Sequence, residues 1–451
     1  MIEQLYSIFQ QCTCVTTDSR NCPKDSLFIA LKGETFNGNA FAAKALEAGS
    51  KFVVIDEAEY LPQGDNRYML VDSSLKALQQ LANYHRRQLG ASAPCMPGEG
   101  KGIPVIGITG TNGKTTTKEL TAAVLMKKYH VLYTQGNLNN SIGVPLTLLR
   151  LKPEHEIAII EMGASHPGDI QELVDIAEPN FGLITNVGRA HLQGFGSFEG
   201  VKRTKGELYD FIQAHQGEVV INADSDDLMQ MASARGLNKL TYYGETTTLD
   251  VTVRGRIADH SSLLHFQWST ILSAGGICNS NDVQTHLIGA YNLSNMLAAI
   301  TFGIKFGVPE DQICEALRNY EPHNNRSQLM KTASNTLIVD AYNANPTSMK
   351  AALDNFHDLQ ADNKMLILGE MRELGADSEK EHQQIIQLIQ DYGFQDVILV
   401  GSEFAKTANA FHCFPDVNAV AEVIKADKPQ GKTILIKGSN GTKLFTLPEL
   451  L

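Results

Sequence analysis

The residues with the clearest chemical potential stand in one segment, IPVIGITGTNGKTTT at 103–117. An apolar, β-branched run leads into a turn with Gly110 and Gly113, and Lys114 and Thr115 follow where a helix should begin. Glycines let backbone N–H groups approach phosphate oxygens, a lysine adds positive charge, and a threonine hydroxyl suits Mg²⁺. The segment predicts an ATP-binding phosphate loop that consists of Gly110, Thr111, Asn112, Gly113, Lys114, Thr115 and Thr116.

The strict phosphate-loop pattern is not met, because Ile108 stands where the pattern requires glycine and Gly107 comes one residue too early. A glycine-rich turn that binds nothing is the alternative. Gly-Lys-Thr directly after a β-branched strand favours nucleotide binding over that alternative.

An acidic residue ends the next apolar run, EIAIIE at 156–161. The carboxyl ends of parallel strands are where α/β sheets bind ligands, so Glu161 is a candidate for Mg²⁺ binding; a solvated strand end is the alternative. The run FGLITNV then leads into a loop with Asn186 and His191 over the same edge. Residue types alone give His191 no role, and Lys205 in the following helical stretch would by default be exposed.

The pattern from 103 to 320 supplies a scaffold for these residues. Apolar runs alternate with amphipathic helical stretches, as in a parallel sheet covered by helices. Residues 240–288 alternate differently and predict an antiparallel β insertion. A second alternating block at 321–451 predicts another α/β domain, which lacks G-x-G-x-x-G after its first strand and so gives no support for dinucleotide binding.

The start of the chain reads as a separate unit. Residues 1–90 mix short apolar runs with helical stretches and predict a small N-terminal α/β domain. Residues 91–102, with two prolines and three glycines, predict a linker. The expected fold class is therefore α/β with three domains, at 1–90, 103–320 and 321–451.

The overall charge, the lengths of the apolar stretches and the cysteine spacing argue against several classes of protein. Lys and Arg number 38 against 50 Asp and Glu, and this charge of −12 argues against a protein that coats nucleic acid or an anionic membrane. Glu3 stands where a signal peptide would be cationic, and no stretch approaches the roughly 18 apolar residues of a membrane span. The seven cysteines lack paired C-x-x-C spacing; Cys12, Cys14 and Cys22 could hold a metal, but thiols in a reducing compartment are expected. We expect a cytoplasmic protein.

Six motifs, in this order, resemble the Mur ligase family: GITGTNGKTTT, EMGASHPGDI, TNVGRAHLQGFGS, VKRTKGEL, GAYNLSNMLAA and DAYNANPTSMKAAL. The resemblance covers nearly the whole chain. It implies an N-terminal domain for the UDP end of the substrate, a central P-loop ATPase domain, and a C-terminal Rossmann-like domain that closes over the nucleotide. DAYNANP, NNSIGVPLTLL, TDSR and LFIALKG are similar to segments of members that join D-alanyl-D-alanine to UDP-N-acetylmuramoyl-tripeptide. These two small molecules are the expected partners of a monomer.

The resemblance also implies roles for individual residues. Contacts to the acceptor substrate are implied for Ser19, Arg20, Lys32, Asn139 and Asn140. Nucleotide contacts are implied for Asn292, Asn295, Arg326 and Asp340, and amine-substrate contacts for Asn343 and Asn345. The asparagines at 139 and 140 could equally form a turn. Tyr291 stands where relatives often have histidine, which puts a direct adenine contact there in doubt.

The implied reaction activates a carboxylate with the γ-phosphoryl group of ATP, and an amine then attacks the acyl phosphate. The implied catalytic residues are Lys114, Glu161, His191, Lys205 and Arg326. Lys205 is similar to the family's carbamylated lysine, and a carbamate there would join Thr115, Glu161 and His191 around one or two Mg²⁺ ions.

Three other readings stay open. The family member that adds the third amino acid typically carries an Asp-Asn-Pro-Arg-like segment, which this chain lacks. Folylpolyglutamate synthase shares the loop but has no N-terminal UDP-binding domain. A non-catalytic P-loop protein that binds ATP and switches partners is the alternative from a different class.

Overall fold

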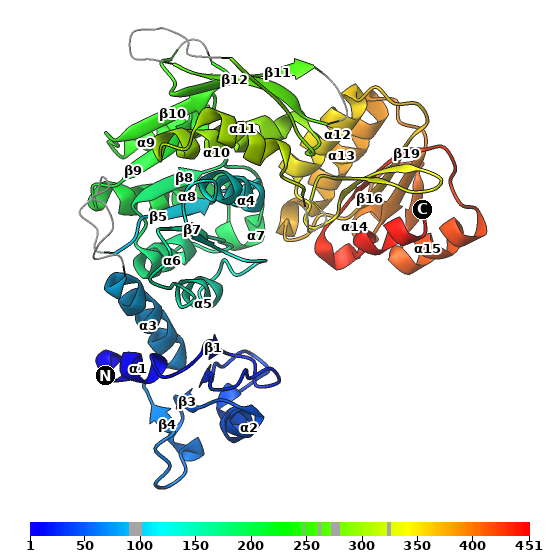
Figure 1. Ribbon diagram of the computed structural model, residues 1–451. Coiled ribbons are helices and arrows are strands. Elements are labelled where there is room, and N and C mark those ends of the chain that lie inside the picture. Colours follow the sequence, from blue (N-terminus) through cyan, green and yellow to red (C-terminus); the bar gives the residue numbers. More distant parts are fainter. Residues whose placement is uncertain (90–101, 247–248, 260–262, 272–279, 323–325) are drawn as a thin grey trace.

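The computed structural model describes residues 1–89, 102–246, 249–259, 263–271, 280–322 and 326–451. Their strands form three sheets of four, nine and six strands, which Figure 1 shows as three blocks along the chain. The predicted α/β fold class is confirmed. The domain boundaries stay predictions, because residues 90–101 and 323–325 lie outside the described residues and include nearly all of the predicted linker. No helix in the described part is long and apolar enough to cross a membrane.

The N-terminal sheet is wholly parallel. Its strands, in spatial order, are β1 (Val15–Thr16), β2 (Leu27–Ile29), β3 (Phe52–Ile55) and β4 (Tyr68–Leu70). Three helices accompany it: α1 (Ile2–Phe9), α2 (Ala42–Ala48) and α3 (Ser74–Gln88). The side chain of Ser73 accepts a hydrogen bond from the N–H of Lys76 and so caps the start of α3, the helix that leads towards the central block.

The central sheet has β5 (Val105–Thr109) between β7 (Ile157–Glu161) and β8 (Phe181–Ile184), all parallel and all buried. The outer parallel neighbours are β6 (Val131–Tyr133) and β9 (Glu218–Asn222). Such continuous apolar strands are typical of parallel sheets with helices on both faces. The register pairs Ile108 with Glu161 and Thr109 with Ile184, so the loops after β5, β7 and β8 leave the sheet side by side.

Helices cover both faces of this sheet. One face packs against α4 (Lys114–Leu125), α10 (Leu293–Lys305) and α11 (Glu310–Arg318). The opposite face packs against α5 (Gly143–Leu148), α6 (Asp169–Ala177), α8 (Phe198–Ala214) and α9 (Asp226–Ala234). The short helix α7 (Leu192–Phe195) packs against α8. The helical stretches predicted between the apolar runs of 103–320 are therefore present.

The predicted β insertion differs from the expectation in two respects. Its strands are β10 (Leu240–Gly244), β11 (Val253–Asp259), β12 (His265–Thr270) and β13 (Asn281–Gln284). They extend the central sheet. β10 is parallel to β9 and β11 is parallel to β10, whereas β12 is antiparallel to both β11 and β13. The wholly antiparallel reading was wrong because a strand with one more exposed face, such as β11, alternates in the sequence whichever way its neighbour runs.

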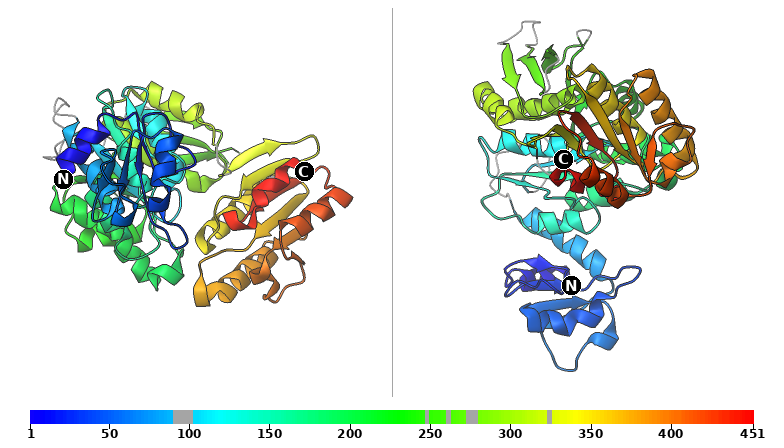
Figure 2. Two further views of the ribbon diagram at one scale, coloured as in Figure 1. Left: turned by 90° about the horizontal axis from the view of Figure 1, so that it is seen from below. Right: turned by 90° about the vertical axis from the view of Figure 1, so that its right-hand side faces the viewer.

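The third sheet has the order β14 (Gln328–Lys331), β15 (Thr336–Asp340), β19 (Thr433–Lys437), β16 (Lys364–Gly369), β17 (Val397–Val400) and β18 (His412–Phe414). All pairs are parallel except β14 with β15. Its helices are α12 (Pro346–Asp358), α13 (Ser378–Asp391), α14 (Ser402–Ala405) and α15 (Val417–Ala426), which line two separate cores on its two faces. Figure 2 shows this block standing beside the central one.

Helix α3 packs against the central block as well as against α1. Leu78 and Leu81 of α3 belong to the same apolar core as Leu148 of α5 and Ile170 of α6. At the end of α3, Arg86 is only 2% exposed. Its guanidinium donates to the Glu178 side chain at 2.9 Å and to the Glu178 carbonyl at 2.7 Å, directly after α6. This ion pair fastens the two blocks together.

We expect Arg86→Ala to lower the free energy of unfolding by about 3 kcal/mol, because it removes one partner of a buried ion pair and leaves a cavity. Arg87 contacts the same carboxylate from the surface, so Arg87→Ala is the matched control and should cost no more than about 1 kcal/mol. Urea denaturation of both variants measures the difference. Equal losses would show that burial of Arg86 adds nothing.

Candidate active site

The glycine-rich loop has the backbone geometry that its sequence predicted. Gly110 and Gly113 have φ values of 141° and 79°, which side-chain-bearing residues rarely adopt. A Cβ on Gly110 would lie 2.0 Å from the Thr185 hydroxyl oxygen, and one on Gly113 would lie 2.6 Å from an Asn295 side-chain oxygen. The loop therefore needs both glycines, and it delivers the first N–H groups of α4 to the sheet edge.

The ammonium of Lys114 lies over this loop. It donates to the carbonyl oxygens of Gly110 at 2.8 Å and Thr111 at 3.1 Å. Burial lowers its pKa to about 8, while Glu161 acts in the opposite direction. An anion placed at the loop would raise that pKa again, because it would favour the charged form. The lysine is thus held where phosphate oxygens would meet it.

Glu161 is 1% exposed and shares its Oε1 atom between two donors. The Thr115 hydroxyl donates to Oε1 at 3.1 Å and the Asn139 amide at 2.9 Å. The backbone N–H of Glu161 donates to the hydroxyl of Thr134. The other oxygen, Oε2, is buried without a hydrogen-bond partner among the described residues. Such an orphaned carboxylate oxygen is a suitable ligand for a cation.

The loop after β8 brings Asn186 and His191 to the same edge. Asn186 accepts from the N–H of Asn112 at 3.0 Å and so braces the glycine-rich loop. His191 has a left-handed backbone with φ of 51°, and Glu373 of the third block, with φ of 63°, contacts its Nδ1 atom. Burial lowers the pKa of His191, and the Glu373 carboxylate opposes that shift.

Lys205 lies on α8, facing inward and only 2% exposed. Its ammonium forms no hydrogen bond or ion pair within the described part of the chain and lies 5.7 Å from the centre of the Phe195 ring. Burial, reinforced by the nearby charge of Lys114, lowers its pKa well below the ordinary lysine value. The expectation of an exposed surface lysine is wrong, because α8 turns this residue towards the sheet. A lowered pKa favours the neutral amine, which is the nucleophilic form of lysine.

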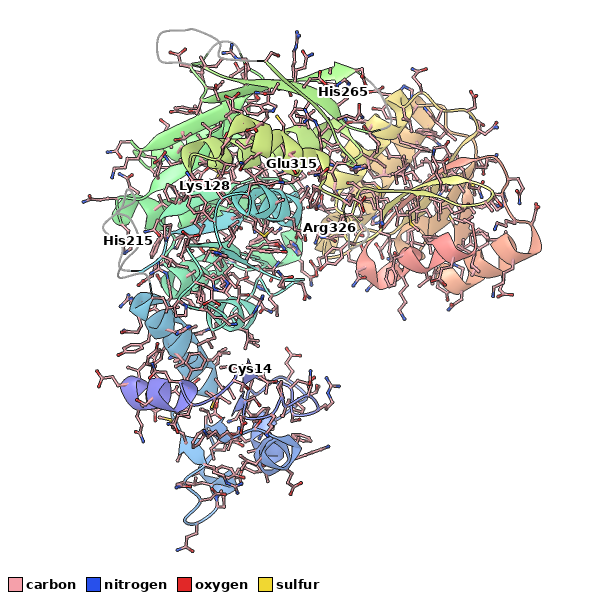
Figure 3. All side chains as sticks on the ribbon, viewed as in Figure 1. Cys14, Lys128, His215, His265, Glu315 and Arg326 are labelled. Carbon is pink, nitrogen blue, oxygen red and sulfur yellow. The ribbon has the colours of Figure 1, made fainter. Side chains whose placement is uncertain are left out.

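The third block contributes its own polar side chains. Arg326 lies where the central and third blocks meet, as its label in Figure 3 shows, and its guanidinium is 4.0 Å from the centre of the Tyr342 ring. Asp340 pairs with the buried Lys437 at 2.5 Å. The Asn345 amide donates to the Asn112 side chain at 2.8 Å, which joins this block directly to the glycine-rich loop.

These groups surround one cavity of about 610 Å³ between the central and third blocks. It is lined by most of the predicted site residues: Thr111, Asn112, Gly113, Lys114, Thr115, Thr116, Asn139, Asn140, Glu161, His191, Asn292, Asn295, Arg326, Asp340 and Asn343. Lys205 is not part of its lining. A cavity of this size suits a nucleotide-sized ligand.

The predicted adenine-side asparagines form a buried chain of hydrogen bonds. Asn295 donates to the Asn292 side-chain oxygen at 2.8 Å and accepts from the Thr117 hydroxyl at 3.0 Å. Asn292 in turn donates to the Ile288 carbonyl. The chain fixes the start of α10 against the start of α4, so both asparagines shape the cavity wall.

The predicted acceptor contacts are divided between two places. Asn139 and Asn140 line the cavity, and Asn140 also caps the turn before α5 by accepting from the N–H of Gly143 at 2.8 Å. Ser19, Arg20 and Lys32 lie in the N-terminal block, away from the cavity. There Lys32 pairs with Glu57 at 2.6 Å, and Arg20 pairs with its neighbour Asp18. Their role stays a prediction.

Several site residues were missed from the sequence. Lys437 ends β19 at the edge that faces the nucleotide loop, and a cation directly after the apolar run TILI is a signal that could have found it. Glu373 offered no such signal, because it lies in a loop with a left-handed backbone. Within the described residues, no three His, Cys, Asp or Glu side chains are grouped closely enough to hold a metal. Cys12, Cys14 and Cys22 therefore do not form a metal site there, and all three are free cysteines.

Three family descriptions match successive parts of the chain. They are the Mur ligase family catalytic domain at 11–86, the Mur ligase middle domain at 108–303, and the Mur ligase, glutamate ligase domain at 325–440. Together they span most of its length.

Relatives and solved structures agree with these matches. The UDP-N-acetylmuramoyl-tripeptide--D-alanyl-D-alanine ligases of Bacillus subtilis (strain 168) and Escherichia coli (strain K12) are each 35% identical, over 95% of this chain and 91% of theirs. A crystal structure of MurF from Acinetobacter baumannii covers 100% of this chain and 98% of its own, with a TM-score of 0.83 and 28% identity. MurF from Thermotoga maritima, solved in complex with ADP, has the same fold, with a TM-score of 0.83 at 23% identity over 98% of this chain and 97% of its own. The chain belongs to the Mur ligase family.

Proposed function

We propose that this protein is an ATP-dependent ligase that joins D-alanyl-D-alanine to the peptide carboxylate of UDP-N-acetylmuramoyl-tripeptide, in peptidoglycan precursor synthesis. One observation carries the proposal: a single cavity is lined by a phosphate loop, an acidic strand end and the cationic Arg326 of a second block. Relatives of that name, 35% identical over nearly the whole chain, support the choice of substrates. The ATP requirement favours the cytoplasm, and we propose a monomer because the cavity is complete within one chain.

Amide formation from a carboxylate in water is uphill, so the carboxylate must first take the γ-phosphoryl group of ATP. Both reactants are anions, and their repulsion must be offset while they are held in line. Lys114 and Arg326 reach the cavity from opposite blocks and supply that positive charge. The amine of the dipeptide then attacks the acyl phosphate, and phosphate leaves.

The residues present also fit Mg²⁺. The buried Oε2 atom of Glu161 lacks a hydrogen-bond partner in the described part of the chain, and the Thr115 hydroxyl lies beside the same carboxylate. Both are the hard oxygen ligands that Mg²⁺ prefers. When bound, the ion would neutralise phosphate charge and polarise the oxygens that react.

Lys205 would complete the site as a carbamate. Burial favours its neutral amine, which would attack CO₂ to form an N–C bond and release a proton, and the product is an anionic carbamate. The positive charge of Lys114 would stabilise that anion. His191, held by Glu373, lies in the same region and is proposed to orient the carbamate or the metal.

Lys114→Ala should lower kcat for ligation by about a hundredfold or more, because it removes charge aimed at the transferring phosphoryl group. Steady-state kinetics with both substrates measure the loss. Lys127→Ala is the control, since Lys127 follows the same helix but pairs with Glu315. Wild-type kcat and KM for ATP in Lys114→Ala would contradict the phosphate-loop role.

Specificity for a dipeptide can be tested by competition. With ATP and UDP-N-acetylmuramoyl-tripeptide present, D-alanyl-D-alanine should be incorporated in preference to any single amino acid, because the chain lacks the Asp-Asn-Pro-Arg-like segment typical of the family member that adds a single third amino acid. Mass spectrometry of the product identifies the added group. Preferred incorporation of a free amino acid would refute the substrate while leaving the ligase class intact, and ATP use without either substrate would favour a P-loop switch.

Lys205→Ala should lose most activity, and a small carboxylate such as formate should restore part of it by occupying the vacant position. Lys202→Ala is the control, because Lys202 is fixed at the surface by Asp227 at 2.7 Å. Near-normal turnover of Lys205→Ala without added carboxylate would rule the carbamate out.

The pH dependence follows from the direction of the Lys205 pKa. Because burial lowers that pKa, a larger fraction of the amine is neutral near neutral pH than in an ordinary lysine, whose pKa is about 10.4. As pH falls through the lowered pKa, the ammonium form takes over and the carbamate should be lost. ¹³C NMR with labelled bicarbonate should show a carbamate signal that fades on acidification and is absent from Lys205→Ala.

A further inference from the structure

A second buried lysine lies behind the phosphate loop. Lys118 is one turn beyond Lys114 on α4, and it is 1% exposed. Long charged side chains are almost never buried this deeply unless they are paired. The phosphoryl-transfer chemistry described above does not use it, since it is absent from the cavity lining.

The charge partners of Lys118 are two glutamates. Its ammonium lies 3.8 Å from Oε2 of Glu161 and 3.5 Å from Oε1 of Glu119. Glu119 is also engaged elsewhere, because the Tyr320 hydroxyl donates to its other oxygen at 2.7 Å. The ring of Tyr133 closes the remaining side, with its centre 5.8 Å from the ammonium. Water is therefore kept from the Lys118 ammonium.

The approach to Glu161 is one-sided. Thr115 and Asn139 donate to Oε1, whereas Oε2 has no hydrogen-bond partner in the described structure and forms an ion pair with Lys118. A distance of 3.8 Å is too long for a hydrogen bond but close enough for strong attraction in a dry region. Lys118 thus balances the charge of Glu161 without occupying the oxygen's lone pairs.

We propose that Lys118 acts as a resident counter-ion that keeps divalent metal out of the Glu161 site until nucleotide arrives. This inference rests on the proposed function, in which Glu161 binds Mg²⁺. A metal ion at Glu161 would lie within a few ångströms of the Lys118 ammonium, and the two cations would repel each other. The phosphates of ATP bring enough negative charge to offset that repulsion, so metal is retained as part of a metal–nucleotide complex.

The arrangement also explains why the lysine is not simply an apolar residue. Without Lys118, Oε2 of Glu161 would lose its ion-pair partner whenever metal is absent and only the charge of Lys114 would offset the buried carboxylate, which costs stability. Free divalent metal could then occupy the site alone and obstruct the entry of the metal–nucleotide complex. The single positive charge of Lys118 both offsets the charge of Glu161 and disfavours binding of free metal.

The test uses Mn²⁺ alone as the probe, titrated into the nucleotide-free full-length protein and followed by the EPR signal of the free ion. Lys118→Met should bind Mn²⁺ at least about tenfold more tightly than the wild type. Lys118→Arg keeps the positive charge and should bind Mn²⁺ as weakly as the wild type. Lys127→Met is the matched control, because it removes a lysine charge near the end of the same helix and far from Glu161. If Lys118→Met does not fold, Lys118→Gln removes the charge while keeping a polar side chain.

Two further measurements separate the possible results. Mn²⁺ should raise the Tm of Lys118→Met and not that of the wild type, and adding Glu161→Gln to Lys118→Met should abolish the tight binding. Unchanged or weaker Mn²⁺ binding by both neutral variants would overturn the counter-ion role. If Glu161→Gln leaves ligation and its Mg²⁺ requirement unaltered, the metal site of the proposed function is wrong. If Glu161→Gln abolishes ligation while the Lys118 variants bind Mn²⁺ like the wild type, only the counter-ion role of Lys118 is wrong.

Discussion

The position of β5 between β7 and β8 is the constraint on which the site depends. Three parallel strands that end at the same level must have their following loops at one edge of the sheet. The register pairs Ile108 of β5 directly with Glu161 of β7. The glycine-rich turn, the acid and the loop that carries His191 are therefore neighbours before any side-chain contact forms. The hydrogen bonds of Thr115 and Asn186 then fix what the backbone has already brought together.

The cavity brings fixed charges of both signs together, as a site for a metal ion and a polyanion requires. Lys114, Arg326 and Lys437 line it, and so do Glu161, Asp169, Glu172 and Asp340. Each of these cations is buried or held by a neighbour, so each is fixed before the ligand arrives. Preorganised charge of this kind stabilises a phosphoryl group without the cost of rearranging water.

The sequence predicted those parts of the site that depend on local patterns. Glycine, lysine and threonine after a β-branched strand specify a backbone shape within a few residues, and an acid at the end of an apolar run marks a sheet edge. Lys118, Glu373 and the inward direction of Lys205 could not be found in this way. Each depends on which face of a helix, or which loop of a distant block, tertiary packing turns towards the site.

The same limit applies to the fold. The three alternating blocks were visible because apolar runs recur with a regular period, whereas the direction of β10 and β11 depends on how the chain crosses over between paired strands, which the alternation of residues does not encode. Asn140 both forms a turn and lines the cavity, and the sequence could not distinguish these two roles because either one suits an asparagine at that position.

The core that α3 shares with the central block bears on how the protein opens. Since Leu78 and Leu148 belong to one continuous apolar cluster, the first two blocks must lose their packing together, as one cooperative unit. The third block has two cores that are separate from this cluster, and one of them includes Ile288 of the central block; around the cavity the two blocks meet through polar contacts such as Asn345 with Asn112. Slow hydrogen exchange should therefore extend unbroken from the first block into the second, and the boundary between protected regions should fall at the nucleotide cavity itself.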